Sequence, residues 1–174
     1  NKFPKSNILV ISPTKPLSSQ IAKEVEESTN IPSKKIALLT GAITPEERTK
    51  IFNNSKVIVA TPQTIQFDVE KKRINLEKTS LLVVDECHRS KERFANTLVA
   101  KAYNNQAINK LTLSLTASPG ATKEKVREVC SNLFIENIEL RTESDDDMSQ
   151  HIQYKESEYI KVKLPENFKK IQST

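Results

Sequence analysis

Short apolar segments alternate with longer polar segments along most of the chain. The apolar segments predict β-strands at residues 7–12, 35–40, 56–61, 80–85, 110–115 and 135–140. Most of them are rich in Val, Ile and Leu and lack a clean polar alternation, which is typical of strands covered on both faces of a parallel sheet. The pattern therefore favours a mostly parallel sheet.

The polar segments between these strands have the composition of helices. They predict helices at residues 17–29, 45–53, 63–72, 90–104 and 122–132. One of these helices has a clear start, because Thr44 can act as its N-cap, Pro45 suits the first helical position, and Glu46 and Glu47 fall in the first turn. Strands and helices that alternate in this way predict an α/β domain with helices on both faces of the sheet, hence three layers.

Composition narrows the class of protein. The chain has 174 residues, of which 36% are hydrophobic and 28% charged, enough for one medium-sized domain with a core. No apolar run approaches the roughly 20 residues that span a bilayer, and the first ten residues do not resemble a signal peptide. Cys87 and Cys130 lie far apart in sequence and fit a reducing compartment, so we expect a cytoplasmic protein. Together with His88 they lack the four-ligand spacing of a zinc site.

The formal charge of the chain is +5, from 27 basic and 22 acidic residues. This excess suits a polyanionic partner such as nucleic acid. Solvated lysines on helix surfaces would give the same number. Charge alone therefore leaves the partner open, and the motifs have to decide it.

Two adjacent acids stand at the end of the predicted strand at 80–85. In open parallel sheets the ligand lies beyond the carboxyl ends of the strands, where Asp85 and Glu86 are expected. There Asp85 could hold Mg²⁺ through its water shell, while Glu86 could orient or deprotonate the water that attacks a phosphate. The alternative is a solvated pair of acids that ends a strand. The four preceding apolar residues and the following Cys-His favour the catalytic interpretation.

Residues 85–88, Asp-Glu-Cys-His, resemble the DECH form of motif II (Walker B) in superfamily 2 helicases. Further segments resemble motifs of the first RecA-like lobe in the expected order. SPTKPLSSQ (12–20) is similar to motif Ia, TGAITPEER (40–48) to the glycine-containing turn, ATPQTI (60–65) to the TP motif and LTASPG (115–120) to motif III. DECHR, LTASPG and the RTESDDD that precedes YIKVKLP most resemble archaeal Hef and FANCM-type branched-DNA helicases. RNA helicases of the Dicer and RNA-sensor group share DECH and are the near alternative.

This resemblance implies a RecA-like, P-loop NTPase-type domain that is incomplete at both ends. Residues 1–140 would form part of the helicase N-terminal ATPase lobe, and residues 141–174 a connector towards a missing insertion or second lobe. The intact parent would use ATP and Mg²⁺ in DNA repair and act on nucleic acid, with branched or single-stranded DNA expected. Whether the parent also carries a nuclease domain is left open by the sequence.

The resemblance also assigns roles to individual residues. His88, Thr116 and Ser118 would couple the nucleotide to movement between lobes. Three turns carry hydroxyls, a lysine and exposed amides, which suit contact with phosphates without reading bases. The residues expected to bind nucleic acid there are Pro13, Thr14, Lys15, Gly41, Thr61 and Pro62. The plain alternative for each turn is helix capping or a simple reversal of the chain.

The 174 residues contain no phosphate-binding loop of the type GxxxxGK[ST], since Gly41 and Gly120 are the only glycines. We therefore expect an ATP-dependent helicase or translocase, of which this piece alone is inactive and binds no cofactor tightly. A non-catalytic nucleic-acid-binding adaptor is the alternative. A flavodoxin-like or dinucleotide-binding domain fits poorly, because SPTKPLSSQ after the first strand is not glycine-rich.

Overall fold

The structure is a computed structural model that describes residues 5–118, 122–141 and 160. The chain divides into a compact unit, Asn1–Asn137, and a second unit, Ile138–Thr174. The expected turn residues Pro119 and Gly120 and nearly all of the expected connector at 141–174 lie outside the described residues. The connector and its boundary at residue 140 remain predictions. None of the described helices has the length and apolar composition that crossing a membrane would need.

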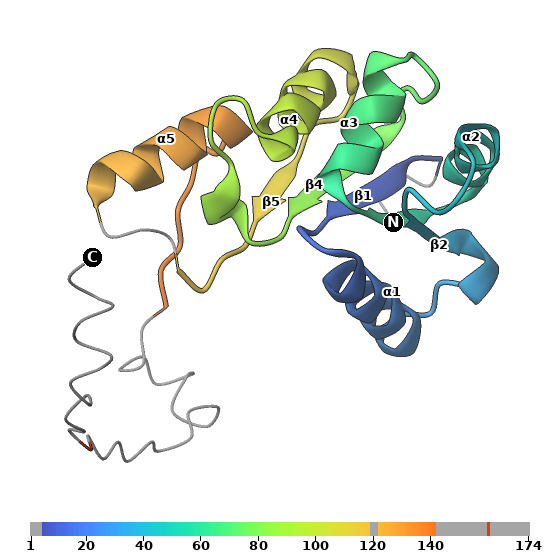
Figure 1. The fold of residues 1–174 in the computed structure, drawn as a ribbon, viewed down its shortest axis with the longest axis horizontal. Helices are drawn as coiled ribbons and strands as arrows, with labels where there is room; N and C mark the ends of the chain where they lie inside the picture. The colour runs from blue at the N-terminus through green and yellow to red at the C-terminus, as the bar shows by residue number, and fades with distance from the viewer. Residues whose placement is uncertain (1–4, 119–121, 142–159, 161–174) are drawn as a thin grey trace, which may run out of the picture. The chain divides into compact units, whose positions relative to one another are not determined.

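In the described part of the first unit, one sheet holds five parallel strands (Figure 1). They are β1 (Asn7–Ile11), β2 (Ile36–Leu39), β3 (Val57–Ala60), β4 (Thr79–Val84) and β5 (Thr112–Ser114). Their order across the sheet is β2-β3-β1-β4-β5, so the first strand lies in the centre. The predicted parallel sheet and five of its six strands are confirmed.

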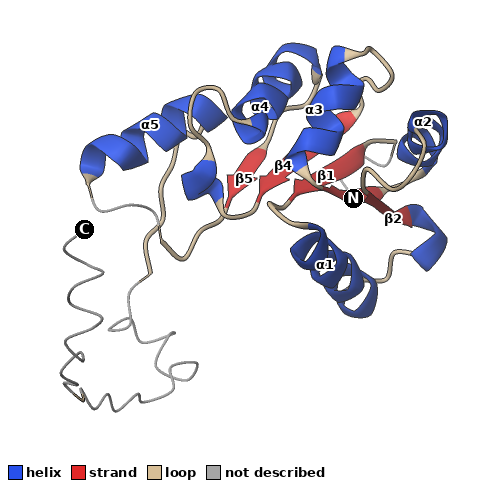
Figure 2. Cartoon of the chain, in the orientation of Figure 1, coloured by secondary structure: helices blue, strands red, loops and turns tan. Residues whose placement is uncertain are grey.

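An α-helix follows each of these five strands along the chain (Figure 2). The helices are α1 (Lys15–Ser28), α2 (Pro45–Asn54), α3 (Pro62–Glu70) and α4 (Ala95–Gln106), with α5 (Lys123–Leu133) after β5. Two short 3₁₀ helices, η1 (Ser33–Lys35) and η2 (Cys87–Arg89), complete the described elements. Thr44 caps α2 as predicted: its hydroxyl accepts from the Glu47 amide at 3.4 Å and donates to the Glu47 carboxylate at 3.1 Å.

The helices cover the sheet on both faces, which confirms the three-layer α/β fold. Alternate residues of each strand point to opposite faces. On one face, Val10, Val57 and Val59 pack against α1. On the other face, Leu9, Ile58 and Leu82 belong to the larger core. That core also receives buried side chains from α2, α3, α4 and α5, and α3, α4 and α5 lie together on this side in Figure 1.

The strand predicted at 135–140 is wrong. Phe134 ends α5 in the left-handed region at φ 58°, and the Ile135 amide donates to the Cys130 carbonyl at 2.9 Å. The residues that follow have no partner strand among the described residues, and Ile138 and Leu140 are 57% and 67% exposed. Apolar residues alone do not make a strand without a neighbour to pair with.

The helix predicted from residue 90 begins five residues later, at Ala95. The preceding segment is held as a turn, because the Phe94 amide donates to the Lys91 carbonyl at 3.0 Å and the Thr97 hydroxyl donates to the same carbonyl at 2.8 Å. Side-chain bonds to the backbone of this kind compete with helix formation.

The expectation that the strands are covered on both faces fails for β5. On the face that α1 covers elsewhere, Leu111, Leu113 and Leu115 are 63%, 47% and 48% exposed. β4 is the neighbour of β5 among the described strands, and the second edge of β5 is open. β5 is thus an edge strand with an exposed apolar side.

Candidate active site

The predicted site residues lie at the end of the sheet where the parallel strands terminate, which we call the carboxyl edge. Because all described strands are parallel, the segments that follow them emerge at the same edge. Across the sheet they follow in the order Gly41 after β2, Thr61 after β3, Pro13–Lys15 after β1, Asp85–His88 after β4 and Thr116 after β5. The residues predicted to bind nucleic acid therefore occupy one half of the edge, and the predicted catalytic and coupling residues the other.

Asp85 is fixed where the two halves meet. Its backbone amide donates to the Ile11 carbonyl at 2.9 Å, and the Ser12 hydroxyl donates to Asp85 Oδ2 at 3.0 Å. Ser12 is fully buried. Our sequence reasoning missed this serine, although it stands directly after a buried strand, which was the available signal. The bond orients the carboxylate at the end of β4.

A carboxylate held in this way suits a Mg²⁺ ion that keeps water and phosphate ligands. In the described part of the chain, no group of three or more His, Cys, Asp or Glu residues could hold a metal ion. A magnesium ion at Asp85 would therefore depend on oxygens from water and from a phosphate-bearing ligand. This donor set fits a hydrated Mg²⁺ and does not resemble the four-ligand site of zinc.

Glu86 has a strained backbone. Its φ of 51° and ψ of 47° lie in the left-handed region, where a non-glycine residue costs about 1–3 kcal/mol. The neighbouring Cys87 amide donates to the Leu115 carbonyl at 3.0 Å, which helps to hold this conformation. The left-handed turn ends β4 and leaves the Glu86 side chain partly exposed, at 36%.

Thr116 joins Glu86 to His88. The Thr116 hydroxyl lies 2.9 Å from His88 Nδ1 and 3.4 Å from Glu86 Oε2, and His88 Nδ1 lies 3.2 Å from the same carboxylate oxygen. Ser118 reaches this group through its backbone amide, which donates to Thr116 Oγ1 at 3.1 Å. The structure thus brings Glu86, His88, Thr116 and Ser118 together across β4 and β5.

The segment after His88 is tied to two helices. Ser90 is fully buried, its hydroxyl accepts from Asn96 of α4 at 3.2 Å, and its carbonyl accepts from Asn132 of α5 at 2.9 Å. Burial, with a smaller contribution from the nearby Cys130, raises the pKa of the Cys87 thiol to about 11. Cys87 therefore remains a protonated, unreactive thiol at neutral pH and serves the packing.

On the other half of the edge, the hydroxyls of Thr14 and Thr61 have different partners. Thr14 caps α1 by accepting from the Leu17 amide at 3.4 Å, and Lys15 beside it is exposed. Thr61 precedes Pro62 at the start of α3, but its hydroxyl bonds to the Thr64 hydroxyl at 2.9 Å instead of capping the helix. The capping interpretation therefore holds for the Thr14 side chain and not for that of Thr61.

The glycine at position 41 is not required by the surrounding protein. A Cβ added to Gly41 would meet no atom within 4 Å, and its φ is outside the range that favours glycine. Gly41 is also exposed. The open space in front of its backbone is available to a ligand.

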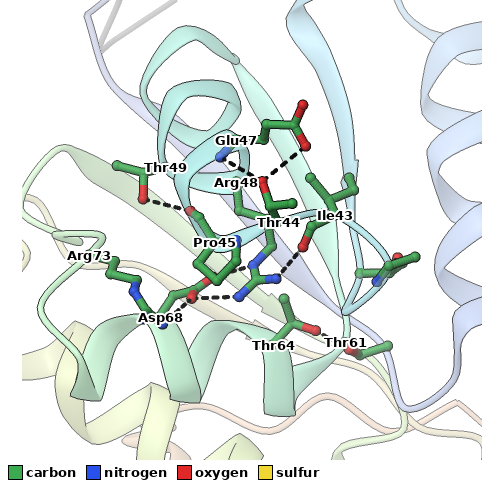
Figure 3. Close-up of polar contacts among 12 residues, drawn as sticks. Ile43, Thr44, Pro45, Glu47, Arg48, Thr49, Thr61, Thr64, Asp68 and Arg73 are labelled. Carbon is green, nitrogen blue, oxygen red and sulfur yellow. Dashed lines mark hydrogen bonds and ion pairs between the residues drawn. The ribbon is translucent and has the colours of Figure 1, made fainter.

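A buried ion pair between α2 and α3 lies close to this turn, and Figure 3 shows its two residues, Arg48 and Asp68. Arg48 of α2 donates to both carboxylate oxygens of Asp68 of α3, at 2.5 and 2.7 Å, and Arg48 Nη1 donates to the Ile43 carbonyl at 2.5 Å. The hydrogen bond to Asp68 raises the pKa of Arg48. Our sequence reasoning missed both residues, because each looked like an ordinary charge on a helix.

Two cavities follow this edge. One, of about 460 Å³, lies between the segment 41–45 and the start of α3, including Gln63, Thr64 and Phe67. The second, of about 400 Å³, is lined by Pro13, Pro62, Gln63, His88 and residues of the segment 89–96. Gln63 lines both, so a nearly continuous surface leads from Gly41 to His88. A larger cavity, of about 960 Å³, lies among residues at the amino ends of the strands, such as Asn7, Lys56 and Lys78, and is remote from Asp85.

Comparison with known proteins identifies relatives of this chain. The family model described as DEAD/DEAH box helicase matches residues 1–128. A putative ATP-dependent RNA helicase of Methanocaldococcus jannaschii is 37% identical over 94% of the chain, and the ATP-dependent DNA helicase fml1 of Schizosaccharomyces pombe is 36% identical over 93%. The chain spans only 21% and 19% of the lengths of these two relatives.

A solved structure agrees with these sequence matches. The Hef helicase domain of Pyrococcus furiosus is 44% identical to this chain and superposes with a TM-score of 0.83. The match covers 97% of this chain and 36% of that structure. A hypothetical ATP-dependent RNA helicase from Sulfolobus tokodaii, at 23% identity and a TM-score of 0.62, shares the fold.

Proposed function

Because this chain belongs to the DEAD/DEAH box helicase family, we propose that it is part of the first ATPase lobe of a longer, ATP-dependent DNA helicase. The proposal is carried by one observation. The Asp85–Glu86 pair and the turns around Thr14, Gly41 and Thr61 share one edge of the sheet, joined at the Ser12–Asp85 bond. Such an arrangement can place hydrolysis of a nucleotide next to a strand of nucleic acid.

Asp85 and Glu86 have separate roles in this proposal. Asp85, oriented by Ser12, would hold a hydrated Mg²⁺, which when bound with ATP neutralises charge on the phosphates. Glu86 would orient the attacking water and accept its proton, and its partly exposed carboxylate permits this. The phosphate-binding loop and the arginine that complete such a site would come from other parts of the parent protein.

His88, Thr116 and Ser118 would transmit the state of the nucleotide. The Thr116 hydroxyl contacts both Glu86 and His88, so a change at Glu86 alters the bond that holds the end of β5. Because two helices fix Ser90, the response would be passed to α4 and α5. The second lobe would receive this movement.

Pro13, Thr14, Lys15, Gly41, Thr61 and Pro62 would contact the backbone of the nucleic acid. Support comes from the open space at Gly41, the exposed Lys15 and the cavities that connect these turns to His88. We favour DNA, in single-stranded or branched form, because the fission yeast relative is named a DNA helicase. The archaeal relative is named an RNA helicase, which keeps RNA as the second candidate.

The change Glu86→Gln in the full-length protein tests the proposal. Nucleotide binding should persist while nucleic-acid-stimulated ATP hydrolysis falls at least about 100-fold, as expected for the loss of a positioned acid-base group. A matched control is Glu77→Gln, because Glu77 is exposed at the amino end of the same strand. Full turnover in the Glu86→Gln protein would remove Glu86 from this role.

A further inference from the structure

Arg48 and Asp68 form a charged pair inside the protein, with side chains only 6% and 1% exposed. The pair joins α2 to α3, and Arg48 also bonds to the Ile43 carbonyl in the segment that leads into α2. All three contacts come from one planar guanidinium, which fixes their mutual geometry. Figure 3 shows Arg48 between Ile43 and Asp68.

Stability alone is a weak reason for such a pair. Removing two charges from water is costly, and well-packed apolar side chains of the same volume often stabilise a protein as well or better. What apolar side chains cannot do is fix one arrangement of a carbonyl, a helix and a carboxylate. The pair is therefore better explained by the geometry that it holds than by the stability that it adds.

The geometry that it holds is that of two predicted nucleic-acid turns. Ile43 is two residues after Gly41, and Asp68 lies on α3, which begins at Pro62 directly after Thr61. Arg48, Gly41, Thr64 and Phe67 line the same cavity of about 460 Å³. The ion pair thus fixes the spacing of the two sides of this cavity.

Arg73, three residues beyond the end of α3, is a second arginine next to Asp68. Its Nη1 lies 3.7 Å from Asp68 Oδ1, and its guanidinium lies 5.1 Å from the ring centre of Phe67. Phe67 is 45% exposed and lines the cavity. Asp68 therefore stands between two arginines, one that holds the Gly41 turn and one that packs on Phe67.

We propose that the Arg48–Asp68 pair is a positioning device that sets the turn at Gly41 and the start of α3 at the spacing at which both contact the backbone of one nucleic-acid strand. This inference rests on the proposed function. The pair itself stays buried and touches no ligand. Its contribution is preorganisation, because a turn that is already held in place loses less conformational entropy when it binds.

The test uses Arg48→Lys and Asp68→Asn in the full-length helicase. Single-stranded DNA affinity should fall about tenfold, the scale of one charge-assisted hydrogen bond. The slope of log affinity against log salt should decrease in magnitude by about 1, because one phosphate contact is lost. ATP hydrolysis at saturating DNA should stay within about twofold of wild type, since chemistry is untouched. The double variant should bind DNA no more weakly than either single variant, because each single change already disrupts the Arg48–Asp68 pair.

A control separates positioning from general destabilisation. Tyr103→Phe removes a buried hydroxyl of α4 that bonds to the backbone of Leu111. Neither residue lines this cavity, so DNA affinity and salt slope should be unchanged. If Arg48→Lys fails to fold, Asp68→Asn carries the same measurements, because it keeps the Arg48 bond to Ile43.

The two proposals fail in different ways. Absence of DNA-stimulated hydrolysis in the wild-type protein would refute the proposed function. Stimulated wild-type hydrolysis, together with folded Arg48→Lys or Asp68→Asn proteins that bind DNA with unchanged affinity and salt slope, would refute the positioning role alone. Loss of turnover at saturating DNA with normal affinity would also refute it.

Discussion

A single hydroxyl connects the two motifs at the end of β4 and β5. Thr116 contacts Glu86 and His88 at once, whereas Ser118 contributes its amide to Thr116. The resemblance pointed to both hydroxyls, and the geometry gives them unequal parts. At the residue scale, the proposed coupling therefore depends more on Thr116 than on Ser118.

The change Thr116→Val tests this coupling, since valine has a similar shape and lacks the hydroxyl. In the full-length protein, strand separation should fall by about tenfold while DNA-stimulated ATP hydrolysis falls less, because Glu86 itself remains. Unwinding and phosphate release would be measured on the same preparation. Ser118→Ala should have the smaller effect of the two. Equal losses of unwinding and hydrolysis in Thr116→Val would indicate a structural role.

At the scale of elements, hydrophobic pattern and capping chemistry were sufficient for most of the fold. Strand β3 is buried throughout, and α2 begins at Thr44 and Pro45 as predicted. The errors arose where contacts with residues distant in sequence determine the structure. Residues 135–140 have strand-like apolar content but no partner strand among the described residues, and the Arg48–Asp68 pair joins two residues that are 20 positions apart in the chain. Neither feature is encoded in a local pattern.

One buried tyrosine of α4 binds the segment that leads into β5. The Tyr103 hydroxyl lies 3.2 Å from the Asn109 and Leu111 carbonyls and accepts from the Leu111 amide at 2.9 Å. Burial raises the pKa of this hydroxyl, so it remains protonated and able to donate at neutral pH.

Tyr103→Phe should lower the free energy of unfolding by about 1–3 kcal/mol, because the Leu111 amide loses its acceptor. Urea unfolding followed by far-ultraviolet circular dichroism measures this change. A loss below about 0.5 kcal/mol, the range of ordinary surface substitutions, would show that water replaces the hydroxyl.

At the scale of the whole molecule, the 174 residues hold only part of the machinery that we propose. Asp85 and Glu86 are present, but the chain has no glycine-rich loop for the β and γ phosphates. The predicted backbone contacts at Thr14, Lys15, Gly41 and Thr61 remain. The isolated chain should therefore differ sharply from the parent in hydrolysis, and less in binding.

We expect the isolated 174-residue chain to release no phosphate from ATP. It should bind single-stranded DNA with a Kd on the order of 10⁻⁴ M and a salt slope of about −2 to −3, because two or three phosphates are engaged. A titration of labelled DNA at two salt concentrations, beside a phosphate-release assay, measures both. DNA-stimulated hydrolysis by this chain would contradict the assignment of an incomplete lobe, and tight, sequence-selective binding would favour an adaptor.

The strand order has a consequence for synthesis on the ribosome. Among the described strands, β1 and β2 are made before β3, yet neither pairs with the other, and β3 is the strand that joins them. At about 5–20 residues per second, roughly 45 residues separate the end of β1 from the start of β3, a delay of several seconds. During that time the apolar segment Asn7–Ile11 lacks both of the strands that it pairs with in the described sheet, β3 and β4. The segment is therefore accessible to chaperones until Val57 has emerged.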